Sequence, residues 1–220
     1  METAELAKLI KGRRSVRLWQ DKPVPEKLLM EAIELATWAP NGGNRQNWHF
    51  YVVLNKGTIK ALADAQAVGR DVMASWAGAG AFAPPPPAPG QPPPPPRSPF
   101  SAAPAVIAVG TRKQENPMEK VFRAHESDPR AAAMRQANVT VDSRIQSVSA
   151  AIAYLLLVLH HFGLGAVWMT GPLPQCKAET EKILKCPADM DIVALIPVGY
   201  PAETPTRDRK AVADVSTVIR

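Results

Sequence analysis

Cysteine and histidine, the residues that build most metal sites and disulfide frameworks, are scarce in this chain. Two cysteines and four histidines occur among 220 residues. Cys176 and Cys186 lack the CxxC spacing of zinc and redox motifs, and no histidine lies close to them in the sequence. His160 and His161 would point about 100° apart on a helix, which does not suit a shared metal. We therefore expect reduced thiols, no metal, and histidines that pack or cap a helix end.

Long apolar runs and a hydrophobic leader are lacking as well. The first residues, METAELAKLIKGRR, contain no apolar core of a secretory signal. The longest uninterrupted apolar run, from Ala150 to Leu159, is too short to span a bilayer and is typical of a buried core helix. These absences predict a cytoplasmic protein with no membrane partner.

Signatures of hydrolases and of Rossmann domains are also missing. No GxSxG nucleophile elbow occurs. The Gly163-Leu164-Gly165 triplet follows a predicted helix and precedes a predicted strand, which is the reverse of the Rossmann order. The hydrophobic content of 46% and charged content of 21% are ordinary for a globular protein. We expect one domain over residues 1–220, with a proline-rich insertion at about 82–99.

Positive charge is plentiful and gathers at both ends of the sequence. The formal net charge is +6. Two basic groups at opposite ends of a chain can meet around one phosphate, or they can remain separate solvated patches. The N-terminal group is Lys8, Lys11, Arg13, Arg14, Arg17 and Lys22, and the C-terminal group is Arg207, Arg209 and Lys210.

Proline dominates one internal stretch. The runs Pro84–Pro87 and Pro92–Pro96 lack backbone donors and fix φ, so they favour polyproline II over a helix or a central strand. Such a stretch is either a stiff loop within the fold or a ligand for an SH3-like partner.

Hydrophobic periodicity predicts alternating helices and short strands, and therefore an α/β or α+β fold. We expect loop and short helix over 111–130. Helices are predicted at 3–11, 26–39, 58–76, 141–162 and 175–185, and strands at 50–54, 105–110, 166–170 and 192–198.

The stretch from Leu35 to Leu54 places a helix end, a polar turn and a strand within twenty residues. Pro40 is expected to stop the helix, and Gly42 and Gly43 permit positive φ. The carboxamides of Asn44 and Gln46 can each donate and accept, which suits the edge of a heterocycle. The other interpretation is an ordinary loop whose amides satisfy backbone groups.

Four blocks of sequence together resemble the nitroreductase family of flavin-dependent oxidoreductases. They are RRSVR at 13–17, AP followed by NRQNWHF within 39–50, GLGAVWMTG at 163–171, and IPVGYP with RDRK within 196–210. The resemblance implies an α+β fold with a central, mostly antiparallel sheet wrapped by helices. It also implies an obligate homodimer that binds FMN at the subunit interface.

By position, the resemblance assigns thirteen residues to FMN. Arg13, Ser15 and either Arg207 or Arg209 would hold the phosphate, and Arg17 would stabilise negative charge at flavin N1 and the C2 carbonyl. The loop would contact the ring and the ribityl chain, and backbone N–H groups after the third block would reach N5 and O4. The full set is Arg13, Arg14, Ser15, Arg17, Pro40, Asn41, Asn44, Gln46, Met169, Thr170, Gly171, Arg207 and Arg209.

The sequence departs from the family pattern at three places. Asn47 replaces a common proline, which predicts a less rigid loop, and Thr170 stands where some members carry an acidic residue. The proline-rich stretch partly replaces helices that usually cover the substrate channel, so substrate preference transfers least.

The implied chemistry is ping-pong hydride transfer from NADH or NADPH through flavin N5 to a nitroaromatic, a quinone or a similar small acceptor. No side chain is assigned an acid–base role. Two alternatives remain: a flavin enzyme of the same fold with different chemistry, such as flavin fragmentation or reductive dehalogenation, and a non-enzymatic module. Such a module would bind nucleic acid through its basic termini and a partner through its prolines. Under the flavin hypothesis no nucleic acid partner is expected.

Overall fold

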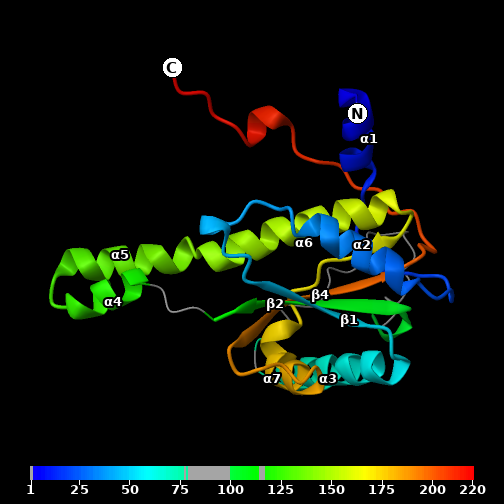
Figure 1. Ribbon diagram of the computed structural model, residues 1–220, viewed down its shortest axis with the longest axis horizontal. Coiled ribbons are helices and arrows are strands. Elements are labelled where there is room, and N and C mark those ends of the chain that lie inside the picture. The colour runs from blue at the N-terminus through cyan, green and yellow to red at the C-terminus, as the bar shows by residue number, and fades with distance from the viewer. Residues whose placement is uncertain (1, 77, 79–99, 114–116) are drawn as a thin grey trace.

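A four-stranded antiparallel sheet of order β1-β2-β4-β3 forms the centre of the protein. The computed structural model describes residues 2–76, 78, 100–113 and 117–220. Helices α2 and α6 cover one face of the sheet and α3 and α7 the other (Figure 1). The strands are β1 (Trp48–Val53), β2 (Ala105–Arg112), β3 (Gly165–Ala166) and β4 (Met190–Gly199). The helices are α1 (Thr3–Gly12), α2 (Glu26–Ala36), α3 (Lys56–Ala74), α4 (Pro117–Ala124), α5 (Pro129–Thr140), α6 (Ser143–His161) and α7 (Leu173–Ile183), with 3-10 turns η1 (Gly42–Asn44), η3 (Phe100–Ala102) and η4 (Val212–Asp214). The predicted α+β class with an antiparallel sheet is thus confirmed.

The two central strands are apolar along nearly their whole length because helices cover both faces of the sheet. Every residue of β2 except Arg112 is buried, and Ile107 and Ala108 lie opposite Ile196 and Leu195 of β4. This burial explains why the sequence AVIAVG shows no alternation of polar and apolar residues.

Helix α6 is the main core helix of the α2 face. Its buried residues recur at helical spacing, and they pack with α2 and β2. The helical stretch from Pro129 to His161 is long and apolar enough to cross a membrane by length and composition alone. However, the buried apolar residues of α6 pack in the protein core. The core residues of α6 are Val148, Ala151, Ile152, Leu155, Leu156 and Leu159.

Helices α3 and α7 approach each other closely at one glycine. A Cβ atom added to Gly69 would lie 2.6 Å from Cβ of Gln175 and 2.7 Å from its carbonyl oxygen. A larger residue there requires the two helices to move apart, so Gly69 sets the distance between α3 and α7.

The predicted strand at 166–170 is wrong in its length. Regular pairing ends at Ala166, and only an isolated bridge between Met169 and Leu195 follows. The N–H of Val167 donates to the carbonyl of Pro197 at 3.3 Å, but proline has no N–H to return a bond. The ladder is therefore interrupted at this point, and residues 167–171 form an irregular segment.

The short helix expected within 111–130 is α4, whereas β2 continues to Arg112 and the further helix α5 was not predicted. Both helices begin at a proline, α4 at Pro117 and α5 at Pro129. Proline at the first helical position lacks only a donor that is unsatisfied there anyway. The side chain of Asp128 accepts the N–H of Arg130 and caps α5.

Other helix ends differ by a few residues. Helix α2 ends at Ala36 rather than at 39, and α3 begins at Lys56 rather than at 58, capped by the side chain of Asn55. The proline-rich insertion at about 82–99 lies outside the described residues, so its interpretation stays a prediction, as does the single-domain boundary.

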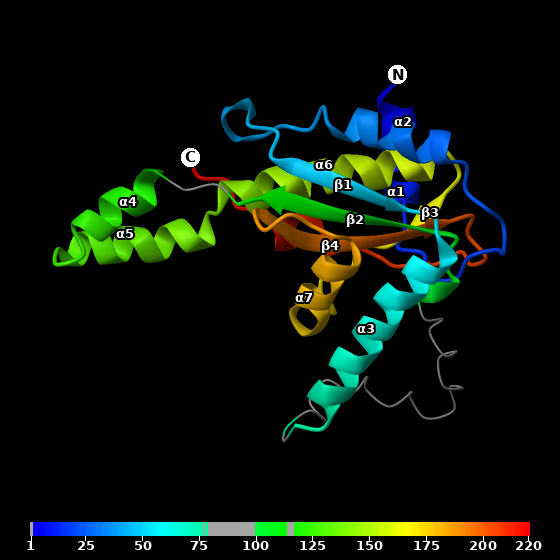
Figure 2. The ribbon, with the colours of Figure 1, turned by 60° about the horizontal axis from the view of Figure 1, so that its bottom comes forward.

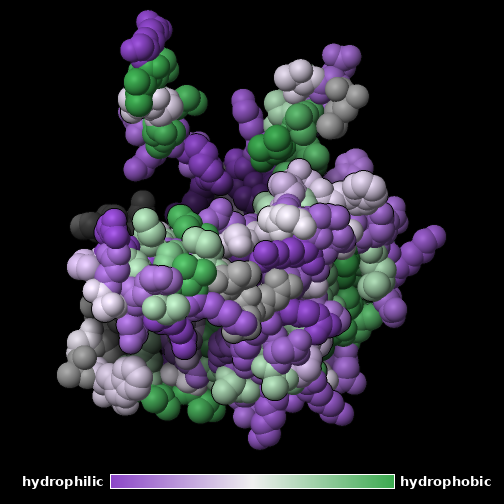
Figure 3. Space-filling view, turned by 60° about the vertical axis from the view of Figure 1, so that its left-hand side comes forward, coloured by the Kyte–Doolittle hydropathy of each residue, from purple (hydrophilic) through white to green (hydrophobic). Residues whose placement is uncertain are grey.

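Three segments stand out from the body of the protein. Helix α1 and the C-terminal tail project on the side of α2 and α6 (Figure 1), and the hairpin of α4 and α5 extends from one end of the sheet (Figure 2). Helix α1 has no buried residue. Figure 3 shows hydrophobic side chains on both projecting ends of the chain. The exposed apolar residues there are Leu6 and Ile10 of α1, and Val212, Val215, Val218 and Ile219 of the tail.

Candidate functional site

The segment after α1 is held against β3. Ser15 forms a parallel bridge with Ala166, and the N–H of Val16 donates to the carbonyl of Ala166 at 3.1 Å. A Cβ atom on Gly165 would lie 2.7 Å from a methyl of Val16, so only glycine permits this approach. The first and third sequence blocks of the resemblance therefore meet.

The fourth block lies along the same segment. The N–H of Gln20 donates to the carbonyl of Tyr200, and the N–H of Ala202 to that of Leu18, both at 2.9 Å. The carboxylate of Glu203 accepts the backbone N–H groups of Arg17 and Leu18. The C-terminal tail consequently leaves the fold beside the N-terminal arginines.

The two basic groups of the sequence meet here. The pKa of Arg13 is lowered by burial first, and then by the positive charges of Arg209 and Arg14. Of the two candidate tail arginines, Arg209 is the one whose charge acts on Arg13, although both side chains are exposed. Three guanidinium groups gathered in this way favour an anion between them.

Arg14 gives a second sign of an anion site. Its Nη1 donates to the carbonyls of Arg13 and Lys11, but its Nε is buried and has no partner among the described residues. A buried donor without an acceptor costs stability. A phosphate oxygen is an acceptor of suitable charge, so the residues present fit the phosphate of FMN.

A cavity of about 520 Å³ opens beside the segment that follows Arg13 and Arg14 in the chain. Arg17 and the irregular segment Met169, Thr170 and Gly171 line it, which brings together four of the predicted site residues. Its size is within the range of small-molecule sites.

Two lining residues from α3 were not predicted from the sequence. Gln66 and Arg70 are four residues apart, so they face the cavity from one side of the helix. Arg70 also donates to the carboxylate of Asp71 at 3.1 Å. The signal in the sequence is the small residues Ala63 and Ala67 interleaved with this polar pair, which marks a helix face that lines a space rather than the core.

The amide-bearing loop before β1 adopts a left-handed backbone. Gly43, Asn44 and Gln46 have φ values of 62°, 51° and 46°. Positive φ was expected at Gly42 and Gly43, and it occurs instead at Gly43 and at the two amide residues. Nε2 of Gln46 donates to Oδ1 of Asn44 at 3.2 Å, and Oδ1 of Asn41 accepts the N–H of Gln46 at 3.1 Å.

This loop is anchored at the beginning of α6, whereas the arginines lie at its end. The N–H of Gly42 donates to Oγ of Ser147 at 3.2 Å, while Gly12 contacts the ring of His160. Thirteen residues of helix separate Ser147 and His160, which corresponds to about 20 Å. Within one chain, the structure therefore does not bring Pro40, Asn41, Asn44 and Gln46 to the arginines.

Asn47 ties the loop to the sheet, contrary to the expectation of a less rigid loop. It is buried, its Nδ2 donates to Oγ1 of Thr111 at 2.8 Å, and its carbonyl accepts the N–H of Arg112 at 2.8 Å. A proline could not make the side-chain bond. Trp48 beside it is buried in the core, while Trp168 is partly exposed at the cavity.

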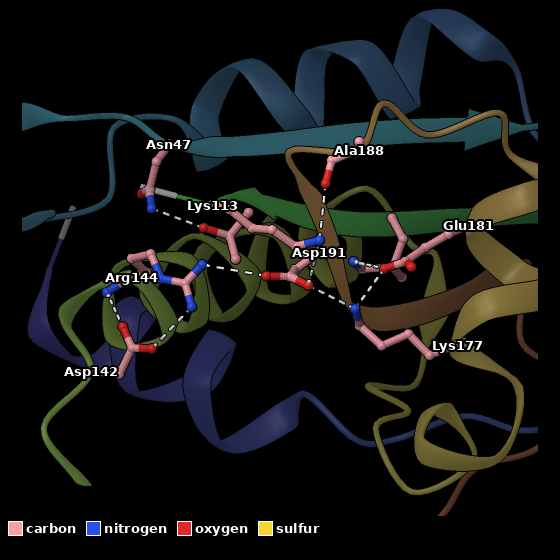
Figure 4. Close-up of polar contacts among 10 residues, drawn as sticks. Asn47, Lys113, Asp142, Arg144, Lys177, Glu181, Ala188 and Asp191 are labelled. Carbon is pink, nitrogen blue, oxygen red and sulfur yellow. Dashed lines mark hydrogen bonds and ion pairs between the residues drawn. The ribbon is translucent and has the colours of Figure 1, made fainter. Parts of the chain in front are cut away.

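A cluster of charged residues holds the beginning of α6 against β4 (Figure 4). Asp191 contacts Lys177 at 2.7 Å, Arg144 at 3.4 Å and Lys113 at 3.7 Å. Burial raises the pKa of Asp191, but the bonds and charges of Lys177 and the other cations outweigh it and hold the pKa below its usual range. Arg144 also contacts Asp142, so the cluster fixes the first turn of α6 near the loop.

The chain was compared with known proteins. The Nitroreductase family model matches residues 10–200. An NADH dehydrogenase of Thermus thermophilus is 31% identical over 194 residues, which is 87% of this chain and 84% of the relative. A BluB-like flavoprotein from Clostridium difficile shares the fold with a TM-score of 0.78 and 22% identity, over 100% of both chains.

A solved structure of iodotyrosine deiodinase bound to FMN and 3-iodo-L-tyrosine also matches. Its TM-score is 0.67 and its identity 22%, over 98% of this chain and 97% of that chain. The match of the family model covers most of the chain, including Arg13, Arg14, the loop and the residues that line the cavity, whereas Arg207 and Arg209 lie beyond it. The chain therefore belongs to the nitroreductase family.

Proposed function

We propose that the protein is an FMN-dependent oxidoreductase that transfers hydride equivalents from NADH or NADPH to a small conjugated acceptor such as a quinone or a nitroaromatic. The observation that carries this proposal is that one short segment supplies both Arg13 and Arg14, with the charge of Arg209 acting on Arg13, and Arg17, which lines the cavity together with Met169. FMN would place its phosphate at the first three arginines and its ring in the cavity.

The phosphate would be held by Arg13 and Arg209, with Ser15 as a neutral donor. Arg14 would supply the buried Nε that has no partner among the described residues. Arg207 is exposed next to this group and can add a further, solvent-screened charge.

The flavin ring would occupy the cavity. Arg17, and Arg70 from α3, would place positive charge near the pyrimidine side, where negative charge collects on reduction. Gln66 would offer both a donor and an acceptor, and the backbone of Thr170 and Gly171 would face the reactive edge. Thr170 carries no acidic side chain, so its role there would be one of backbone geometry.

The rest of the pocket would come from a second copy of the chain. A two-fold dimer with α6 antiparallel to its partner places the loop of one copy at the arginine end of the other. Support comes from a strip of α6 that is partly or fully exposed and apolar: Ala150, Ala153, Tyr154 and Leu157 recur on one side of the helix. In that arrangement Pro40, Asn41, Asn44 and Gln46 of each copy would cover the partner's flavin.

Bound FMN would supply a two-electron carrier that accepts hydride at N5 and releases it to the second substrate, so both substrates would use one site in turn. The protein would bind and orient the flavin, stabilise its reduced form through Arg17 and Arg70, and limit water access through dimerisation. No protein acid or base is required for the hydride step.

The test is direct. The purified protein should bind one FMN per chain, show flavin absorbance near 450 nm as expected of oxidised flavin, and be bleached anaerobically by NADH or NADPH. Addition of a quinone or a nitroaromatic should restore the oxidised spectrum. A protein that binds no flavin would overturn the proposal.

The acceptor panel also separates the alternatives. A halotyrosine that restores the oxidised spectrum while quinones do not would indicate reductive dehalogenation, and loss of the flavin itself under oxygen would indicate flavin fragmentation. Salt-sensitive binding of DNA by a colourless protein would favour the non-enzymatic module.

A further inference from the structure

We propose that His160 is a further member of the anion site, which takes up a proton when a phosphate monoester binds and so makes the site selective for the dianion. This inference rests on the proposed flavin site. The proton would come from solvent and form the second ring N–H, with no other bond made or broken.

The position of His160 is fixed by close packing. It lies in the last turn of α6, and its Nε2 would be 3.1 Å from a Cβ atom placed on Gly12. Gly12 is followed directly by Arg13 and Arg14, so the imidazole supports the piece of backbone from which both arginines extend. Glycine at position 12 leaves room for the ring.

The charged groups that act on His160 are all basic. Its pKa is lowered, first by burial and then by the positive charges of Arg13, Arg14 and His161. Arg13 and Arg14 come from the segment after α1, and His161 from α6 itself. The charge of Arg209 acts on Arg13.

This direction of shift opposes the usual effect of a helix end. A histidine in the last turn normally has a raised pKa, because the negative end of the helix dipole favours imidazolium. Here burial and the positive charges of the neighbouring groups outweigh the helix dipole and lower the pKa of His160. Without an anion, His160 is therefore neutral at neutral pH and can still gain one positive charge.

A bound dianion reverses the sign of the local field. A phosphate monoester carries up to two negative charges above its second pKa of about 6. Placed among Arg13, Arg14 and Arg209, it would offset the charges that lower the pKa of His160, and the helix end would then favour the proton. Anion binding and protonation are thereby linked, so each strengthens the other.

Two consequences follow for the choice of cofactor. The affinity for FMN should increase as the pH falls from 8 to 6.5, by about three- to tenfold, within the limit of one linked proton. Riboflavin has no phosphate, and the diphosphate of FAD carries only about one charge per phosphate. The affinity for either should therefore increase less than the affinity for FMN as the pH falls. His160 thus favours a monoester over a diphosphate.

Calorimetry of FMN binding at pH 7 tests this, with buffers of different ionisation enthalpy that contain no phosphate. The wild-type protein should take up a fraction of a proton per FMN. His160→Gln, which keeps a polar group of similar size, should lose that uptake. His161→Gln is the matched control: His161 is exposed, and its charge only lowers the pKa of His160, so this variant should keep a proton uptake that His160→Gln loses.

A second measurement does not depend on the stability of the variant. The Cε1–H resonance of His160 in the wild-type protein, assigned with single variants at the other three histidines, should titrate at higher pH when FMN is present. Inorganic phosphate alone should produce a smaller shift in the same direction.

The outcomes distinguish this inference from the proposed function. If FMN binds stoichiometrically but proton uptake equals that of His160→Gln, or the resonance does not shift, the role of His160 is overturned and the flavin site stands. If FMN does not bind while inorganic phosphate still shifts His160, the anion site stands without the flavin. If neither binds, both proposals are wrong.

Discussion

The two ends of α6 differ in charge and in how they are built. At its last turn, Arg13 and Arg209 gather beside His160, and the contacts join segments from three distant parts of the chain. At its first turns, the amides of Asn44 and Gln46 belong to a short exposed loop held by Ser147 and the Asp191 cluster. One end suits a phosphate and the other the edge of a ring, yet about 20 Å of helix separates them.

Under the proposed function, each end of α6 would carry half of the polar groups that FMN requires, so one sequence would encode a site that one chain does not form. An antiparallel partner would bring the two ends together and form two equal sites.

Ala153→Glu should have the largest effect, because it places a charge in the middle of the exposed strip of α6. Burying an unpaired carboxylate at an interface is costly, so we expect monomers. Flavin affinity should fall by about 3 kcal/mol or more, since the loop end is lost from each site. Light scattering and flavin titration measure the two effects, with Ala153→Ser as control. A monomer that binds FMN with full affinity would contradict the division of the site.

Arg13→Ala should weaken FMN binding by about 1.5–3 kcal/mol, the value of a charged hydrogen bond. Riboflavin affinity should change little, because the lost partner is the phosphate. Lys8→Ala on the exposed side of α1 is the matched control for net charge. Fluorescence titration of both flavins measures the difference, and equal losses for FMN and riboflavin would place the phosphate elsewhere.

A mixed dimer tests whether Arg13 of one chain and Asn44 of the other serve the same site. When an Arg13→Ala chain pairs with an Asn44→Gly chain, one site should contain both defects and the other neither, because the two residues would meet only across the interface. Glycine is chosen since the φ of Asn44 is 51°. Titration of dimers isolated with two tags should show one site of full affinity. Two equally weakened sites would show that both residues serve the same chain's flavin.

Asp191→Asn should lower stability at neutral pH by about 1 kcal/mol, because three cations lose their shared carboxylate at a partly exposed position. The folded-state pKa of Asp191 is depressed below 3.8. Its contribution is therefore present above that pH and is lost as the pH falls through the native pKa. Urea unfolding at several pH values should show that the variant differs from the wild type at pH 7 and converges with it in acid.

Gln46→Gly should have the smallest effect on folding, a gain of about 0.5 kcal/mol, because glycine relieves a left-handed backbone. Arg45→Gly is the control: its φ is −72°, so glycine there should be destabilising. Chemical denaturation measures both. If Gln46→Gly also weakens flavin binding in the dimer, the amide contributes to the site as well as to the loop.

Most of the architecture was predictable from the sequence because local and global signals agree. The apolar run of β2 and the spacing of Leu29, Ile33 and Ala36 in α2 lead directly to the observed core. Charge alone left open whether Arg13 and the tail converge, and the family resemblance assigned them to one phosphate; in the structure the charge of Arg209 acts on Arg13.

Other features could not be predicted because one residue type serves two purposes. Pro117 and Pro129 each begin a helix, although proline more often marks a loop. Pro197 lies in β4, and its missing N–H ends the regular pairing of β3 with that strand. Gln66 and Arg70 were missed because an exposed polar face of a helix and a cavity-lining face look alike in sequence.

Gly69 also bears on how the active cavity could diversify. It is adjacent to Arg70 and allows α3 to lie against α7 at Gln175. A larger side chain at this one position would push the whole helix outward, and with it the two polar groups that line the cavity. Under the proposed function, acceptor preference would thus be retuned from a distance, through the spacing of two helices, while the groups proposed to hold the phosphate remain untouched.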